Sequence, residues 1–171
     1  MSLLTRLLKP KPDPREALRP LWHAIVERSR EPAWYRENGV ADTVAGRFDM
    51  IITILALVLL RLEPEPDTAA AQVYLTELFV EEMDGQLRET GVGDPVIGKH
   101  VGRLVSALGG RLGAFRDALG QGGEAWTAAV ARNVSVRDGT VPGRLAADFL
   151  ELRDALAAAG TERLIKGEIP R

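Results

Sequence analysis

The 171-residue sequence contains no cysteine, which excludes several kinds of site at once. Without a thiol the chain has no disulfide framework, cysteine-ligated zinc, iron–sulfur cluster or thiol nucleophile. Histidine is limited to His23 and His100, which leaves little for a multi-histidine metal site. None of the four serines lies in a G-x-S-x-G nucleophile motif. We therefore expect a binding protein that uses no metal or cofactor, rather than an enzyme.

A large net charge and a membrane-length apolar run are also missing. The 22 basic and 24 acidic residues give a formal net charge of −2, so overall charge does not drive binding to nucleic acid or membranes. The most apolar stretch is residues 50–60, whereas a bilayer-spanning helix needs about 20 such residues. The start of the chain shows neither a secretory signal nor an Arg/Ser-rich presequence. These features predict a cytoplasmic protein with a buried central helix.

Apolar residues recur at helical spacing along most of the chain, and no strand alternation persists. The sequence predicts an all-α fold, a single globular domain of about six helices packed round the apolar one. We expect the domain to cover residues 15–160, between an N-terminal arm at 1–14 and a loosely held C-terminal tail at 161–171. The predicted helices are 14–30, 42–62, 67–90, 95–119, 124–133 and 144–159.

Two segments allow alternative interpretations. The arm carries leucines at helical spacing and three basic residues, so it either docks on the domain or touches a membrane as a short amphipathic foot. The predicted helix 95–119 contains several glycines, each costing roughly 1 kcal/mol relative to alanine. These glycines indicate either a kink near Gly109-Gly110 or a close approach to another backbone.

The charges are unevenly distributed. Residues 62–94 hold nine acidic residues and one basic residue, whereas residues 95–120 hold four basic residues and one acidic residue. Residues 1–20 are basic as well. Either these regions are solvated and complement one another, or they meet a charged partner. In the second interpretation the contacts come from the acidic face of helix 67–90 or from Lys99 and Arg103.

The acidic residues Glu77, Glu81, Glu82 and Asp84 do not form a recognisable metal motif. Di-metal carboxylate bundles use Glu-x-x-His on facing helices, and this sequence contains none. An enzyme would need a pocket that gathers Asp49, Glu81 or His100 into one site.

Two stretches are more distinctive than helical patterning requires. They are residues 34–50, WYRENGVADTVAGRFDM, and residues 78–94, LFVEEMDGQLRETGVGD, with Lys99 shortly after. Together they resemble the ubiquinol–cytochrome c chaperone family. Its pattern combines an Arg-Phe-Asp/Glu start to an apolar helix with a Met-Asp-x-x-Leu-Arg-Glu-x-Gly-Val-Gly-Asp segment. The resemblance covers roughly residues 33–120. It departs from the family at residues 107–111, ALGGR, where aromatic residues are expected before Gly-Arg.

The resemblance implies a non-catalytic assembly chaperone. Mitochondrial members help newly made cytochrome b to mature into ubiquinol–cytochrome c reductase, with a small partner protein and near the ribosomal exit. For this chain we expect a newly made respiratory membrane protein, cytochrome b, as the client, and at most peripheral contact with the inner face of the membrane. The ribosome and a small partner protein are further expected contacts, and specific nucleic-acid binding is not. The alternative is a general helical adaptor or scaffold at the ribosome or membrane surface without a dedicated client.

The matched residues divide by chemistry. Met83 and Leu87 belong to the apolar face of their helix, and Gly91 and Gly93 shape the turn after it. The polar matched residues, joined by two from the charge pattern, are the expected client contacts. We also expect a groove beside helices 67–90 and 95–119 with an acidic rim. The candidate client-binding residues are Glu81, Asp84, Arg88, Glu89, Asp94, Lys99 and Arg103.

Overall fold

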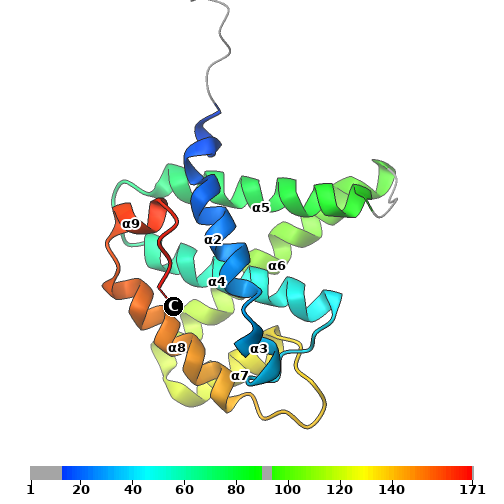
Figure 1. Cartoon of the computed structure of the whole chain (residues 1–171), viewed down its shortest axis with the longest axis vertical. Coiled ribbons are helices and arrows are strands. Elements are labelled where there is room, and N and C mark those ends of the chain that lie inside the picture. The colour runs from blue at the N-terminus through cyan, green and yellow to red at the C-terminus, as the bar shows by residue number, and fades with distance from the viewer. Residues whose placement is uncertain (1–12, 90–93, 171) are drawn as a thin grey trace, which may run out of the picture.

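The computed structural model describes residues 13–89 and 94–170, with side chains described outside 87–100. These residues form helices joined by turns and loops, and no strand; their one extended pairing is an antiparallel bridge between Val40 and Val136. The prediction of an all-α fold is confirmed (Figure 1). The elements are η1 (Pro14–Leu18), α2 (Arg19–Ser29), α3 (Pro32–Arg36), α4 (Val44–Leu62), α5 (Ala69–Glu89), α6 (Asp94–Gln121), α7 (Gly123–Asn133), α8 (Gly143–Ala158) and α9 (Thr161–Ile165).

The first predicted helix is divided into two. Its start is as expected, because the Asp13 side chain accepts a hydrogen bond from the Arg15 backbone N–H at 2.9 Å. The first turn is nevertheless a 3₁₀ helix, η1, and α2 begins only at Arg19. Pro20 explains the break, because it has no N–H to donate to the carbonyl of Glu16 one turn earlier.

Helix α4 is buried from its middle to near its C-terminal end. Every residue from Met50 to Leu59 is buried, and α4 contacts α2, α6 and α8. In Figure 1, α2 crosses in front of α5 and then α4, so it packs on both. The Thr43 side chain caps the start of α4 by accepting a hydrogen bond from the Gly46 N–H at 3.2 Å. Within the residues that the structure describes, no helix has both the length and the apolarity of a membrane span.

Two short helices were not predicted, and each corrects an expectation. Residues 32–36 form α3 where we expected a turn-rich connection. The segment after Gly160, expected to be loosely held, forms α9 and packs on α2. The Leu164 side chain is fully buried, and a β-carbon at Gly167 would lie 2.6 Å from the Pro20 carbonyl oxygen. A single leucine is too weak a sequence pattern to reveal such a contact.

The glycines of α6 do not mark a close approach. The helix runs without interruption from Asp94 to Gln121, and a β-carbon added at Gly102, Gly109, Gly110 or Gly113 would meet no atom within 4 Å. The close-approach interpretation is therefore wrong at these four positions. The predicted turn residues Gly91 and Gly93 lie outside the described residues.

Candidate functional site

The acidic face of α5 is partly occupied by the chain's own N-terminal helices. Arg15 Nη1 donates to Glu81 Oε2 at 2.6 Å, and Arg19 Nη1 lies 3.4 Å from Glu82 Oε1. The complementary-charge interpretation is therefore confirmed for Glu81 and Glu82. Glu81, predicted as a client contact, is an intramolecular partner of η1.

The carboxylates around Arg15 stabilise its charged form. The hydrogen bond with the Asp13 side chain is the largest cause that raises the pKa of Arg15, and Glu81 and Glu77 add to it. In return, the Arg15 side chain and backbone lower the pKa of Asp13 from 3.8 to about 2. Both glutamates raise the pKa of Arg15, because η1 lies beside the Glu77–Glu81 turn of α5.

The other predicted client contacts lie along the α5–α6 hairpin. Asp84 is half-buried on α5, and Arg103 is exposed on α6. Arg88 and Glu89 belong to α5, and Asp94 and Lys99 belong to α6, but their side chains lie outside the described residues. The structure therefore describes the surroundings of three of the seven candidates.

A wide groove lies between the first half of α4, the last turns of α5 and the middle of α6. It has a volume of about 840 Å³. We call it the Phe48 groove; its apolar lining is Val44, Ala45, Phe48, Ile51, Met83, Leu104 and Ala107, and its polar lining is Arg30, Arg47, Gln86 and Arg103. Val44, at the edge of this groove, is 88% exposed.

The floor of the Phe48 groove rests on a row of aromatic rings. The ring of Phe48 stacks on that of Phe79 with centroids 6.4 Å apart, and Phe79 contacts Trp22 at 6.1 Å. Phe79 and Trp22 are fully buried. The groove is therefore supported from α5 and α2 rather than held open by loops.

The described rim of the Phe48 groove is basic, not acidic as expected. Arg47 pairs with Asp42 at 2.7 Å, whereas Arg30 and Arg103 form no ion pair with any described residue. The sequence correctly predicted that these acidic residues belong to one helix, which is α5. It could not show that Glu81 and Glu82 turn toward η1 and α2 instead of toward α6.

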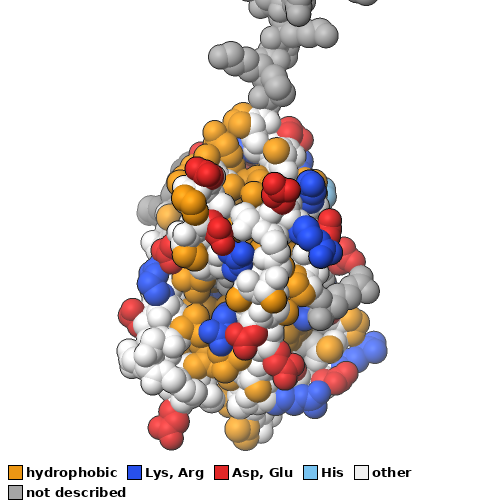
Figure 2. Space-filling view, turned by 90° about the vertical axis from the view of Figure 1, so that its left-hand side faces the viewer, with side chains coloured by type: hydrophobic (Ala, Val, Ile, Leu, Met, Phe, Trp, Pro, Cys, Tyr) orange, Lys and Arg blue, Asp and Glu red, His pale blue; other side chains and the backbone are white. Residues whose placement is uncertain are grey.

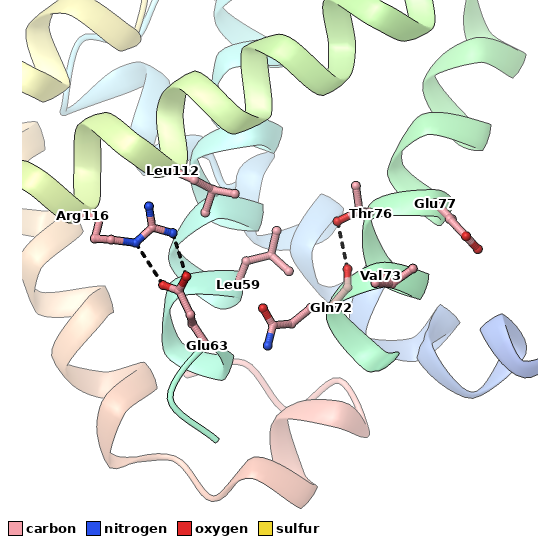
Figure 3. A pocket seen from close by; sticks show the side chains of 8 residues that line it. All are labelled: Leu59, Glu63, Gln72, Val73, Thr76, Glu77, Leu112 and Arg116. Atoms are coloured by element: carbon pink, nitrogen blue, oxygen red, sulfur yellow. Dashed lines mark hydrogen bonds and ion pairs between the residues drawn. The ribbon is translucent and has the colours of Figure 1, made fainter. Parts of the chain in front are cut away.

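A second, smaller groove of about 300 Å³ lies between the C-terminal end of α4, the start of α5 and the second half of α6 (Figure 3). We call it the Val73 groove; it is lined by Leu59, Glu63, Gln72, Val73, Thr76, Glu77, Leu112 and Arg116. Arg116 binds Glu63 at one side through contacts of 2.8 and 3.2 Å. Figure 3 shows Glu77 pointing away from the other lining side chains, toward the outer side of α5.

The face that includes α9 and the first turns of α5 shows no single-sign patch. Figure 2 shows acidic and basic side chains interspersed there, with hydrophobic side chains visible between them. Such a surface does not attract a strongly charged polymer, in agreement with the small net charge.

A buried polar cluster joins α4, α6 and the loop before α8. Arg111 Nη2 binds Asp49 Oδ1 at 3.0 Å, and Nη1 donates to the Asp49 carbonyl oxygen at 2.6 Å and to Thr53 Oγ1 at 2.9 Å. The second carboxylate oxygen of Asp49 accepts hydrogen bonds from the backbone and hydroxyl of Ser135, at 3.0 and 2.7 Å. Burial lowers the pKa of Arg111, although its contact with Asp49 opposes this. Asp49 of the Arg-Phe-Asp motif is therefore a structural residue.

The residues of the enzyme alternative are held by different partners. Asp49 is bound by Arg111 and Ser135, whereas Glu81 is bound by Arg15. The side chain of His100 lies outside the described residues. In the described part of the chain, no group of three or more His, Asp or Glu side chains could hold a metal ion.

Comparisons with known proteins agree with the fold and the motifs. Residues 36–170 match the family described as "Ubiquinol-cytochrome C chaperone". The fold is similar to a crystal structure described as the Cbp3 homolog from Brucella abortus, with a TM-score of 0.78 and 28% sequence identity. That match covers 98% of this chain and 95% of the other. No curated protein matches the chain.

Proposed function

Because the chain belongs to the ubiquinol–cytochrome c chaperone family, we propose that it is a non-catalytic chaperone for the assembly of ubiquinol–cytochrome c reductase. Its client is newly made cytochrome b, which it binds on the cytoplasmic side of the membrane with at most peripheral lipid contact. A small partner protein or the ribosome takes part in this step. The observation that carries the proposal is the family match over residues 36–170, together with the similar fold over nearly the whole chain.

The Phe48 groove supports this role and is the surface that we assign to the client. Its floor is apolar and it is larger than any other groove described above. An unassembled membrane segment has apolar side chains to bury, and covering them prevents aggregation. The arginines at the rim bind carboxylates or backbone carbonyls of the client and so orient it.

The first test is deletion of the gene, followed by measurement of assembled ubiquinol–cytochrome c reductase and the cytochrome b absorption spectrum. We expect both to fall, and full restoration by the wild-type chain. Unchanged complex and spectrum would contradict the proposal. If the purified protein instead recovered ribosomes or lipids equally well from cells lacking cytochrome b, the general adaptor would be the better interpretation.

The groove is tested with a matched pair of surface variants. Val44 and Val141 are both exposed, at 88% and 80%, but only Val44 lines the Phe48 groove. We expect Val44→Glu to reduce crosslinking to cytochrome b by about tenfold, the cost of placing one charge against an apolar partner. Val141→Glu serves as the control and is expected to behave like the wild type. Equal crosslinking of both variants would show that the client binds elsewhere than in this groove.

A further inference from the structure

The Val73 groove has an apolar interior that no described side chain fills. Val73 is 55% exposed, and Leu59 and Leu112 lie across from it on α4 and α6. Glu77 stands at the outer edge. An apolar groove with a carboxylate at its edge suits an occupant with leucines and basic residues.

Residues 1–12 of the same chain have this composition. They contain four leucines, Leu3, Leu4, Leu7 and Leu8, which share one face if the segment is helical. They also contain three basic residues and no acidic one. The groove has two acidic lining residues: Glu63, which pairs with Arg116, and Glu77 at the outer edge. The leucines therefore match the apolar lining, and the basic residues match the carboxylate of Glu77.

The chain enters the described structure close to this groove. Arg15 contacts Glu81 at 2.6 Å, and Glu77, one turn earlier on α5, lines the groove. η1 packs against α5, so the segment before Asp13 begins beside that helix. The five Cα–Cα steps from Leu8 to Asp13 span about 17 Å when extended, and half the circumference of a helix of about 10 Å diameter is about 16 Å, so the arm reaches the far side of α5 only in an extended conformation.

We propose that residues 3–8 dock in the Val73 groove of their own chain, with the leucines in its interior and the basic residues beside Glu77. The arm then covers apolar surface on α5 and leaves the Phe48 groove, which lies between other parts of α4, α5 and α6, to a partner. Since part of the attraction is between exposed charges, it weakens as salt increases.

The absence of cysteine allows a direct test by disulfide trapping. In the full chain carrying Leu7→Cys and Val73→Cys, the only possible intramolecular disulfide joins the arm to the groove. We expect it to form under mild oxidation about tenfold faster than in the pair Leu7→Cys and Ala107→Cys, because docking raises the effective concentration of the thiols. Ala107 is exposed and lines the Phe48 groove, so it is the matched control.

A charge variant tests the specificity of docking. Adding Glu77→Lys to the Leu7/Val73 cysteine pair is expected to slow trapping several-fold, and adding Lys9→Glu as well is expected to restore part of the rate. Far-ultraviolet circular dichroism confirms that each variant remains folded. The assay needs no client, so its outcome is independent of the proposed function.

Three results would overturn the proposal. The first is equal trapping at Val73 and Ala107. The second is a disulfide-linked dimer as the main product, which would assign the groove to a second copy. The third is trapping that is abolished by vesicles of phosphatidylglycerol but not of phosphatidylcholine at low salt, which would assign the arm to an anionic membrane.

Discussion

Among single residues, Asp49 and Arg111 show how a family motif can serve the fold. The Arg111 side chain is only 7% exposed, yet its guanidinium reaches the Asp49 carboxylate, the Asp49 carbonyl and Thr53. Asp49 in turn holds Ser135. A charged group buried to this degree is tolerated because its hydrogen bonds are largely satisfied.

Removing the arginine leaves the carboxylate without its partner. We expect Arg111→Met to lower the free energy of unfolding by roughly 3 kcal/mol, measured by urea denaturation. In the double variant Asp49→Leu and Arg111→Met, part of the loss is expected to be recovered, since no charge remains unpaired. A single variant as stable as the wild type would show that the pair contributes nothing.

Asp13 gives a pH dependence with a defined sign. Its pKa is lowered from 3.8 to about 2 in the folded chain, so folding favours the ionised carboxylate. The resulting stabilisation is complete above pH 3.8 and is lost as the pH falls through about 2. We expect Asp13→Asn to reduce the change in melting temperature between pH 5 and pH 2, recorded by circular dichroism. Identical pH profiles of variant and wild type would contradict this.

Among the elements, α4 and α6 use glycine for different reasons. At Gly46, in the first turn of α4, an added β-carbon would collide with the Ala41 carbonyl oxygen. That contact brings the incoming chain against the helix, where Thr43 caps it. Gly109, in the middle of α6, has open space around it.

The two glycines therefore predict opposite effects of the same substitution. Gly46→Ala is expected to destabilise the protein by roughly 1–3 kcal/mol, because backbone atoms must move. Gly109→Ala is expected to stabilise it by about 0.5 kcal/mol through lower unfolded-state entropy and better helix propensity. Urea denaturation of both variants measures the difference, and a destabilising Gly109→Ala would indicate that α6 needs its flexibility.

On the scale of the whole molecule, α2 and α9, which are far apart in the sequence, pack side by side. α9 contacts α2, and Leu164 is fully buried there. η1 and α2 also pack on α5, and their arginines form ion pairs with Glu81 and Glu82. The packing of η1 and α2 on α5 therefore decides which face of α5 is free for a partner.

The burial of α9 leads to a prediction about the C-terminal segment. We expect Leu164→Ala to lower the free energy of unfolding by about 2–4 kcal/mol, as for other fully buried leucines. The control is Glu162→Ala, whose side chain is exposed on the same short helix, and we expect its effect to stay below about 0.5 kcal/mol. Thermal denaturation of the two variants measures both effects. Equal stability of the two variants would mean that α9 detaches without cost.

The fold was largely predictable because helical periodicity and capping residues act locally. Thr43 before α4 and the apolar run of residues 50–60 depend only on near neighbours in the sequence. The misjudged segments, α3 and α9, are five residues each, too short to show a period. The site was predictable only in part. Glu81 was correctly placed on α5, but its side chain turns toward Arg15, 66 residues earlier.

The sequence by itself determined the helical class, the burial of residues 50–59 and the family, through residue types and spacings that act over one or two helical turns. Only the tertiary structure decided which charges remain available. The packing of η1 and α2 on α5 pairs Glu81 with Arg15 and Glu82 with Arg19. Arg30 and Arg103, beside an apolar groove, stay without carboxylate partners among the described residues. Charge pairing across a helix crossing depends on where side chains point in space, and distance along the chain does not encode that direction.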